Sequence, residues 1–193
     1  AFCKEKGVLL IIDEIQTGFC RTGKFFAIEH CSTPIKPDIL TMGKGIAGGF
    51  PFAAFAVSES VDRQLKKGDH GGTFCGNPLA CAVATEVVAY LRGEKMADRA
   101  AISGTVLLRG LQRIASKYPT LVGAVRGRGL LCAFELQSDE QVVQVTEAAL
   151  DGGLLVTPTK NGIIRLIPPL NVSEHEILHG LNMLDVALGS VSV

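Results

Sequence analysis

The sequence has no apolar stretch long enough to cross a bilayer. A run such as Val8 to Ile12 is far too short, because a membrane-spanning helix needs about 20 consecutive apolar residues. An excess of charge is also missing. The 19 basic and 19 acidic side chains cancel, so nothing favours nucleic acid or an anionic membrane as a partner. These absences leave an ordinary globular composition, in which 47% of the 193 residues are hydrophobic.

Cysteine patterns that hold metals or carry redox chemistry are also missing. The six cysteines form no CxxC pair and show no Cys/His ligand spacing, and the four histidines share no metal-ligand spacing. We therefore predict reduced cysteines, no metal site and a cytoplasmic protein. The chain opens like the end of a helix that leads into a buried strand, without a signal-like pattern. We expect a fragment of a longer protein, for which targeting is not excluded.

Apolar runs and helical periodicity dominate the first half of the sequence. Unbroken apolar runs are typical of strands that are buried on both faces, as in parallel sheets. The predicted strands are Val8 to Ile12, Ile39 to Met42 and Phe52 to Val57. The predicted helices cover residues 59–67, 78–91 and 96–117, with Asn77 as the cap and Pro78 as the first residue of the second helix. Residues 16–37, with polar residues, glycines and prolines, are expected to form a long loop. The helix over 96–117 is expected to carry an apolar stripe on one side, formed by Ile102, Val106, Leu107, Leu111 and Ile114. This pattern predicts an α/β fold.

A second α/β unit is expected after residue 119. Its predicted strands are Leu130 to Leu136, Leu154 to Thr157 and Ile163 to Ile167, and its predicted helices are residues 139–151 and a last helix that begins near Ser173. Ser173 and Glu176 have the spacing of a capping box, and the buried stripe expected on the last helix consists of Ile177, Leu181, Leu184 and Leu188. We therefore divide the chain into a first domain (1–95), a connecting helix (96–118) and a C-terminal small domain (119–193).

Two charged residues stand at the ends of predicted buried strands. Asp13 follows the run Val8 to Ile12, and Lys44 follows Ile39 to Met42 within a glycine-rich stretch. Ligands of open α/β sheets bind outside such strand ends. An amine and a carboxylate that converge there suit pyridoxal phosphate, which bonds to a lysine and needs an acid at its ring nitrogen. Taken singly, Lys44 also fits a solvated loop residue, and Asp13 also fits a structural carboxylate or one half of a buried ion pair.

Three long segments make the sequence similar to a known family. The stretches "LLIIDEIQTGFCRTGKFFAIEH", "KPDILTMGKGIAGGFPFAAF" and "HGGTFCGNPLACA" resemble class III (omega-amino acid) aminotransferases, in order and with the right spacing. The likeness continues through "VRGRGLL" and "IIRLIPPL" to the C-terminus. It implies a pyridoxal 5'-phosphate-dependent enzyme with the type I, aspartate aminotransferase-like fold. Family chains are about twice as long, so the resemblance implies that this is the C-terminal half.

The resemblance also implies a role for individual residues. Lys44 matches the lysine that forms the Schiff base with the cofactor and then moves the proton, and Asp13 matches the carboxylate that holds the ring nitrogen protonated. Ile15 would pack on a face of the ring, and Gln16 would reach the oxygen on its 3′ carbon. Thr73 matches a threonine that binds the cofactor phosphate from the neighbouring subunit, although its position alone fits a turn hydroxyl equally well.

Arg165, in "IIRLIPPL", matches the arginine that binds the substrate carboxylate, for which a guanidinium fork is suited. The resemblance thus implies a homodimer with a shared active site. The implied reaction is a ping-pong transfer of an amino group from an acetylornithine-like ω-amino donor to 2-oxoglutarate. Ornithine and 4-aminobutyrate remain open as donors, and a racemase or aminomutase of the same class remains open as an activity. A non-catalytic module that kept only the fold is the alternative from another class.

Overall fold

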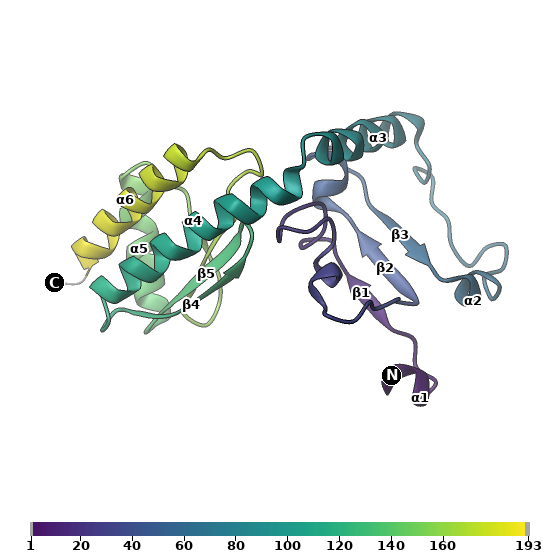
Figure 1. Ribbon diagram of the computed structural model, residues 1–193, viewed down its shortest axis with the longest axis horizontal. Helices are drawn as coiled ribbons and strands as arrows, with labels where there is room; N and C mark the ends of the chain where they lie inside the picture. Colours follow the sequence, from purple (N-terminus) through teal and green to yellow (C-terminus); the bar gives the residue numbers. More distant parts are fainter. Residues whose placement is uncertain (1, 192–193) are drawn as a thin grey trace. The chain divides into compact units, whose positions relative to one another are not determined.

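The computed structural model describes residues 2–191. The chain divides into two compact units, of which the first ends at Ala97 and the second begins at Asp98. Figure 1 shows both units, and each is described here by itself. Both combine a sheet with helices, so the prediction of an α/β fold is confirmed.

The first unit is built on a three-stranded sheet in the order β1-β2-β3. The strands are β1 (Ile11–Asp13), β2 (Ile39–Met42) and β3 (Ala54–Val57). β1 runs parallel to β2, as the sequence predicted, and β3 runs antiparallel to β2. The other elements are α1 (Phe2–Glu5), the 3₁₀ helices η1 (Ala27–His30) and η2 (Lys44–Ala47), α2 (Glu59–Asp62) and α3 (Pro78–Gly93).

The prediction that Val8 to Ile12 forms a buried strand is wrong in this chain. Only Ile11–Asp13 is a strand, and Val8, Leu9 and Ile11 are 57%, 54% and 57% exposed. The reason is that β1 is an edge strand, with β2 as its only neighbour among residues 2–191. A fully apolar run needs a neighbour on each side and covered faces to become buried.

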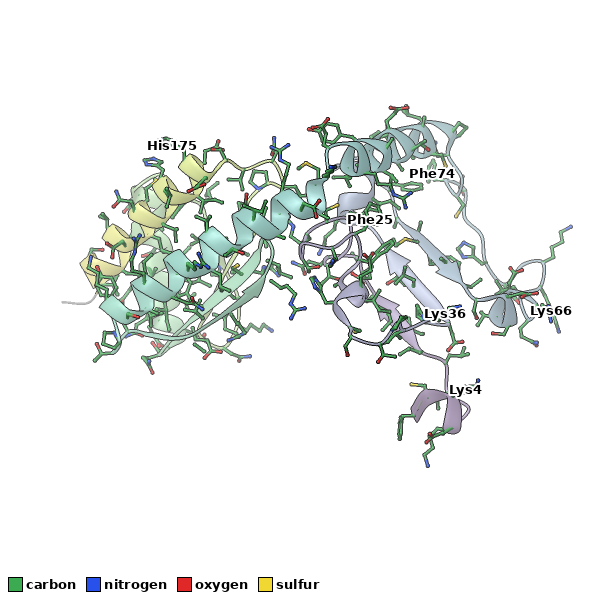
Figure 2. All side chains as sticks on the ribbon, in the orientation of Figure 1. Lys4, Phe25, Lys36, Lys66, Phe74 and His175 are labelled. Atoms are coloured by element: carbon green, nitrogen blue, oxygen red, sulfur yellow. The ribbon has the colours of Figure 1, made fainter. Side chains whose placement is uncertain are left out.

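Residues 16–37 were expected to be a plain loop, but the structure packs part of this segment. Phe19, Phe25 and Phe26 contact one another edge to face, with ring centroids 5.1 to 5.5 Å apart. The guanidinium of Arg92, on α3, lies 5.0 Å from the centre of the Phe25 ring, whose position is labelled in Figure 2. Aromatic and cation–π contacts of this kind hold the segment in one conformation.

The cap of α3 agrees with the sequence. Pro78 is its first residue, and the Asn77 side chain accepts a hydrogen bond from the Ala80 N–H at 3.1 Å. The predicted helix over 59–67 is shorter than expected, since α2 ends at Asp62, and the predicted strand Phe52 to Val57 begins only at Ala54. Boundaries that depend on tertiary contacts are thus less well predicted than those marked by a cap.

The second unit contains an antiparallel sheet in the order β4-β5-β7-β6. Its strands are β4 (Val122–Arg128), β5 (Leu131–Leu136), β6 (Thr157–Pro158) and β7 (Ile163–Leu166), and its helices are α4 (Met96–Lys117), α5 (Asp139–Asp151) and α6 (Glu174–Val191). The bounds of α4 and α5 agree with the prediction. The strand expected at Leu154 to Thr157 is wrong, since only its last residue belongs to β6. The sequence analysis missed β4, because glycines and arginines hide its alternation.

One continuous core holds the second unit together. It joins the buried faces of α4, α5 and α6 to one face of the sheet, and burial alternates along β5 because only every second side chain faces the helices. The predicted stripe of α6 is buried as expected; it consists of Ile177, Leu181, Leu184 and Leu188. In the predicted capping box, the Ser173 N–H donates to the Glu176 carboxylate at 2.8 Å, and the Glu176 N–H donates to Ser173 Oγ at 3.2 Å.

One member of the predicted stripe on α4 is wrong. Leu107, Leu111 and Ile114 are buried, but Ile102 is 68% exposed. Ile102 lies about 140° around the helix axis from Leu107, since each residue of an α-helix turns by about 100°. Ala100, seven positions before Leu107, is buried in its place.

Candidate active site

Asp13 and Lys44 lie at the edge of the first sheet that is formed by the carboxyl ends of its two parallel strands. Asp13, the last residue of β1, stands beside Thr41 in the parallel register, and the Glu14 N–H donates to the Thr41 carbonyl at 2.9 Å. Lys44 opens η2 immediately after Gly43, which follows β2. The parallel pairing therefore places both charged residues beyond the carboxyl ends of neighbouring strands, where ligands of such sheets bind.

The backbone of Lys44 adopts a conformation that side chains rarely tolerate. Its φ is +45°, in the left-handed region. On one side, a Cβ added to Gly43 would lie 3.3 Å from Ile15 Cγ2; on the other, a Cβ added to Gly45 would lie 3.1 Å from Phe19 Cβ. Glycine is thus needed on both sides of Lys44 for close packing, and the Lys44 side chain itself is exposed.

Local hydrogen bonds orient the carboxylates that end β1. Asp13 is exposed, and its Oδ1 accepts the Ile15 N–H at 2.8 Å, which is an Asx-turn geometry. Glu14 is 1% exposed. Its two oxygens accept the Ile28 N–H at 2.8 Å, the Ala27 N–H at 3.0 Å and the Thr17 hydroxyl. Asp13 is thus exposed at the sheet edge, whereas Glu14 is buried against the following loop.

A hollow of about 1090 Å³ lies beside this edge. Ile15 and Thr73 both line it, so the structure brings two of the predicted cofactor contacts together. The other lining side chains are largely apolar and include Phe50, Phe52 and Phe74. Phe74 is 83% exposed and is labelled in Figure 2, in the loop that precedes α3. Gln16 follows Ile15 and is half-buried.

Arg165 lies in the second unit, at the centre of β7. It stands opposite Ala133 on β5 and opposite Thr157 on β6. Arg165 and Thr157 line a cavity of about 320 Å³ whose remaining walls are mostly apolar. Within the part of the chain that the structure describes, the buried Nε of Arg165 has no hydrogen-bond partner. A buried unpaired donor is costly, so this geometry suits an anionic ligand.

Four other arginine, histidine and cysteine side chains are either paired within the protein or affected by burial. Arg126 forms an ion pair with Glu135 on the neighbouring strand. The His30 ring contacts Thr22 at 3.0 and 3.1 Å, and burial lowers the pKa of Arg21. Burial also raises the pKa of the Cys132 thiol to about 11, as expected for a cysteine in the core.

No cluster of three or more His, Cys, Asp or Glu side chains among residues 2–191 could hold a metal ion. None of the helices in that range is long and apolar enough to cross a membrane.

Sequence analysis missed the contribution of Phe19. Its side chain is 3% exposed, and its φ of +55° lies in the left-handed region. The signal that could have found it is the cluster of three phenylalanines within residues 19–26, which is unusual for a solvated loop.

The fold and the sheet edge define a class of enzyme. The structure superposes on acetylornithine aminotransferase from Elizabethkingia anophelis with a TM-score of 0.89 and 36% identity, covering 97% of this chain and 47% of that one. Ornithine aminotransferase from Toxoplasma gondii ME49 gives a TM-score of 0.90 and 39% identity, with 98% and 45% covered. The chain therefore has the fold of the pyridoxal phosphate-dependent aminotransferases, as the sequence predicted.

The family itself follows from the sequence comparisons. The family described as "Aminotransferase class-III" matches residues 1–188, and the chain belongs to it. A mitochondrial acetylornithine aminotransferase from Neurospora crassa is 42% identical over 191 residues, which are 99% of this chain and 41% of that protein. An acetylornithine aminotransferase from Synechocystis is 37% identical over 98% of this chain and 44% of its own length. The chain thus spans somewhat less than half the length of these relatives.

Proposed function

We propose that this chain forms the lysine-bearing half of a class III aminotransferase active site. The reaction would move an amino group from an acetylornithine-like ω-amino donor to 2-oxoglutarate in two half-reactions. The observation that carries the proposal is the position of Asp13 and Lys44 at one edge of a parallel strand pair. The family match and the acetylornithine and ornithine aminotransferases among the relatives support it.

The residues at the sheet edge fit pyridoxal phosphate. Lys44 would bind the cofactor covalently through Nζ, and Asp13 would hold a proton on the ring nitrogen. Ile15, already packed against Gly43, would form an apolar wall beside the ring, with Gln16 at its oxygen and Thr73 at its phosphate. When bound, this cofactor supplies an electron sink that stabilises a carbanion at the carbon bearing the amino group.

Proton transfer is the chemical task of Lys44 in this proposal. Its Nζ would take the proton from the substrate carbon that bears the amino group and deliver it to carbon C4′ of the cofactor within the same half-reaction, and the second half-reaction would run this transfer in reverse. The exposed side chain at the sheet edge has room to swing between these positions. The tight packing on Gly43 and Gly45 would keep its backbone in place meanwhile.

Arg165 is proposed as the carboxylate-binding residue. Its unpaired Nε and its apolar cavity support this role, because a guanidinium binds a carboxylate through two parallel hydrogen bonds. We further propose that residues 1–95 belong to the cofactor-binding large domain, 96–118 to a connecting helix and 119–193 to the small domain. A homodimer that shares Thr73 across its interface, and a cytoplasmic location, complete the proposal.

The test is Lys44→Ala in an enzyme of full family length that carries this sequence. We expect transamination to fall to a few per cent or less, because the proposed proton transfer depends on the Lys44 amine. We also expect borohydride to abolish the visible cofactor absorbance of the wild-type enzyme but to have no such effect on Lys44→Ala. Lys36→Ala is the control, since Lys36 is also exposed in the first unit (Figure 2). Normal activity of Lys44→Ala without added amine would contradict the assignment and favour the non-catalytic module.

The choice of donor needs a separate measurement. Acetylornithine and ornithine aminotransferases both occur among the relatives, and 4-aminobutyrate remains a third donor. Comparing kcat/KM for the three donors, with 2-oxoglutarate as the acceptor, would identify the substrate. A product that keeps its amino group but carries it on another carbon would indicate an aminomutase instead. A product that differs from the substrate only in the chirality of that carbon would indicate a racemase.

A further inference from the structure

We infer that Glu14 is a positioning residue that holds Lys44 and Asp13 in their active arrangement. This inference rests on the proposed function and extends it to a carboxylate that neither touches the cofactor pocket nor lines its hollow. Glu14 is 1% exposed and follows Asp13 directly in the chain. Buried carboxylates are costly unless several donors satisfy them, and Glu14 accepts hydrogen bonds from three donors.

The Glu14 carboxylate locks the loop that follows β1. One oxygen accepts the Ile28 N–H at 2.8 Å, and the other accepts the Ala27 N–H at 3.0 Å and the Thr17 hydroxyl. Ala27 and Ile28 are the first residues of η1, so the carboxylate caps the start of that helix from thirteen and fourteen positions away. The Glu14 side chain thus connects the end of β1 to the first turn of the following loop, at Thr17, and to η1 farther along that loop.

This loop packs against the backbone of Gly45, the residue that follows Lys44. Phe19 lies within it, and Phe19 Cβ would be only 3.1 Å from a Cβ on Gly45. The Phe19 and Cys20 backbones have φ values of +55° and +74°, which is strained for residues with a Cβ and persists only when the surroundings hold it. The Glu14 hydrogen bonds and the packing of Phe19 against Phe25 and Phe26 supply that hold.

The same turn sets the near side of Lys44 and the position of Asp13. Ile15 packs on Gly43, and its N–H is held by the Asp13 carboxylate at 2.8 Å. The Glu14 N–H ties this point to the Thr41 carbonyl on β2 at 2.9 Å. Glu14 therefore stands at the centre of a bracket, defined by Ile15 against Gly43 and Phe19 against Gly45, that encloses Lys44.

The bracket needs a side chain with two acceptor oxygens rather than any polar side chain. Three donors point at the two Glu14 oxygens, so an amide in their place would lose one acceptor and set its own N–H₂ against an N–H. Glu14→Gln keeps the volume but frustrates these hydrogen bonds. Glu29→Gln is the matched control. The Glu29 carboxylate also accepts a backbone N–H of this loop, that of Phe26, at 2.8 Å, but it is exposed and makes no contact with the bracket.

The experiment compares Glu14→Gln and Glu29→Gln in the full-length holoenzyme. For Glu14→Gln we expect kcat per bound cofactor to fall about 10- to 100-fold with a nearly unchanged donor KM. We also expect a shift in the pH midpoint of the cofactor's visible absorbance, because Lys44 and Asp13 are displaced relative to the ring. Glu29→Gln should match wild type in both. Equal kcat and an equal absorbance titration for both variants, with only the melting temperature of Glu14→Gln lowered, would overturn the inference.

A second variant decides the matter if Glu14→Gln does not fold. Gly45→Ala leaves the Glu14 hydrogen bonds intact but pushes a methyl group against Phe19, so it should reproduce the loss of kcat and the absorbance shift. Wild-type kinetics and spectrum in Gly45→Ala would contradict the bracket. The proposed function fails separately, if the wild-type enzyme itself shows no Lys44-dependent cofactor absorbance and no transamination.

Discussion

The two units of the chain differ in how completely each buries its own apolar surface. The second unit has one continuous core, in which residues of α4, α5, α6, β5 and β7 are nearly inaccessible. The first unit has three short strands, and large apolar side chains such as Leu9, Ile11, Phe74 and Leu79 remain more than half exposed. Buried apolar area stabilises a fold by about 25 cal/mol per Å², so the second unit is far closer to a self-sufficient domain.

The proposed chemistry lies mainly in the unit that is less well buried. Asp13, Lys44 and Thr73 are at the surface of the first unit, and only Arg165 comes from the second. Reactive groups need access to ligands, whereas a packed core excludes them. In the proposed assignment, the first unit would supply the cofactor site, and the second would supply a scaffold with one binding residue.

The largest expected effect would test whether the second unit takes part in the chemistry at all. Arg165→Leu should lower kcat/KM for 2-oxoglutarate and for donors with an α-carboxylate by roughly 10- to 1000-fold, because a charge-assisted bidentate pair is lost. Arg165→Lys should recover only part of the loss, since a point charge cannot reproduce the fork. Steady-state kinetics on the full-length enzyme provide the measurement.

Arg128→Leu is the control for that experiment, because Arg128 is an exposed arginine of the same sheet. Donors without an α-carboxylate should lose less in their own half-reaction. A small loss of equal size for every substrate would show that Arg165 is a scaffold residue, and the chemistry would then belong to the first unit alone.

The next effect concerns the packing of the second unit. A Cβ on Gly104, in α4, would lie 2.2 Å from the Gly129 carbonyl oxygen, which is backbone and cannot rotate away. Gly104→Ala should therefore lower the free energy of unfolding by about 2–4 kcal/mol, as overpacking of a tight contact does. Gly93→Ala, at the end of α3, has no atom within 4 Å of its new Cβ and should be neutral or slightly stabilising. Denaturant titration of both variants would measure the difference in the free energy of unfolding. Equal stabilities would show that the second unit accommodates the added methyl group without loss of stability.

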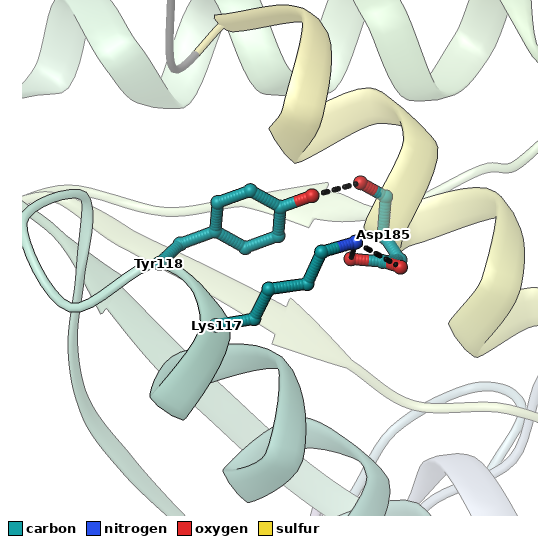
Figure 3. Close-up of polar contacts among 3 residues, drawn as sticks. All are labelled: Lys117, Tyr118 and Asp185. Atoms are coloured by element: carbon teal, nitrogen blue, oxygen red, sulfur yellow. Dashed lines mark hydrogen bonds and ion pairs between the residues drawn. The ribbon is translucent and has the colours of Figure 1, made fainter.

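The smallest effect concerns a surface staple between α4 and α6 (Figure 3). Lys117 Nζ donates to both oxygens of Asp185 at 2.7 and 2.9 Å, and the Tyr118 hydroxyl donates to the Asp185 carbonyl at 3.1 Å. The hydrogen bond from Lys117 lowers the pKa of Asp185, and the bond to Asp185 raises the pKa of Lys117. Since Lys117 is exposed and Asp185 is only partly buried, Asp185→Asn should lower the melting temperature only slightly at pH 7.

The direction of each pKa shift sets the pH range of that small effect. A carboxylate with a lowered pKa stabilises the fold above its unfolded pKa of about 3.9 and loses this contribution as the pH falls through the folded value. The raised pKa of Lys117 preserves its contribution below about pH 10. The difference between wild type and Asp185→Asn should therefore shrink in acid. A difference between wild type and Asp185→Asn that stays the same from pH 7 to pH 3 would contradict this role of the ion pair.

Local sequence signals predicted helix bounds and caps better than they predicted burial. The bounds of α4 and α5, the Asn77 cap and the Ser173–Glu176 box all agree with the structure, since periodicity and capping act within a few residues. The strand at Val8 to Ile12 and the Ile102 position failed for the opposite reason. Their burial depends on which elements pack beside them, and an apolar sequence pattern does not specify those neighbours.

The candidate site divides in the same way. The positions of Asp13 and Lys44 at strand ends follow from the sequence, because an apolar run that stops at a charge marks where a strand leaves the sheet. Their arrival at one edge was predicted from the parallel pairing, and the structure has that pairing. The packing of Phe19 on Gly45 was not predictable, since it joins residues whose distance depends on a strained turn.

The amino-acid sequence by itself determined the family, the α/β class, the main helices and the identity of the charged residues at the strand ends, because these reside in local pattern and in long matching motifs. Only the tertiary structure decided that β1 is an exposed edge strand and that the buried Glu14 carboxylate accepts three donors from separate parts of one loop. It also decided that Arg165 Nε, beside a mostly apolar cavity, has no hydrogen-bond partner among residues 2–191. Each of these features depends on which residues are in contact in the folded chain. Burial and hydrogen-bond satisfaction are set by those contacts and not by the type of a single residue.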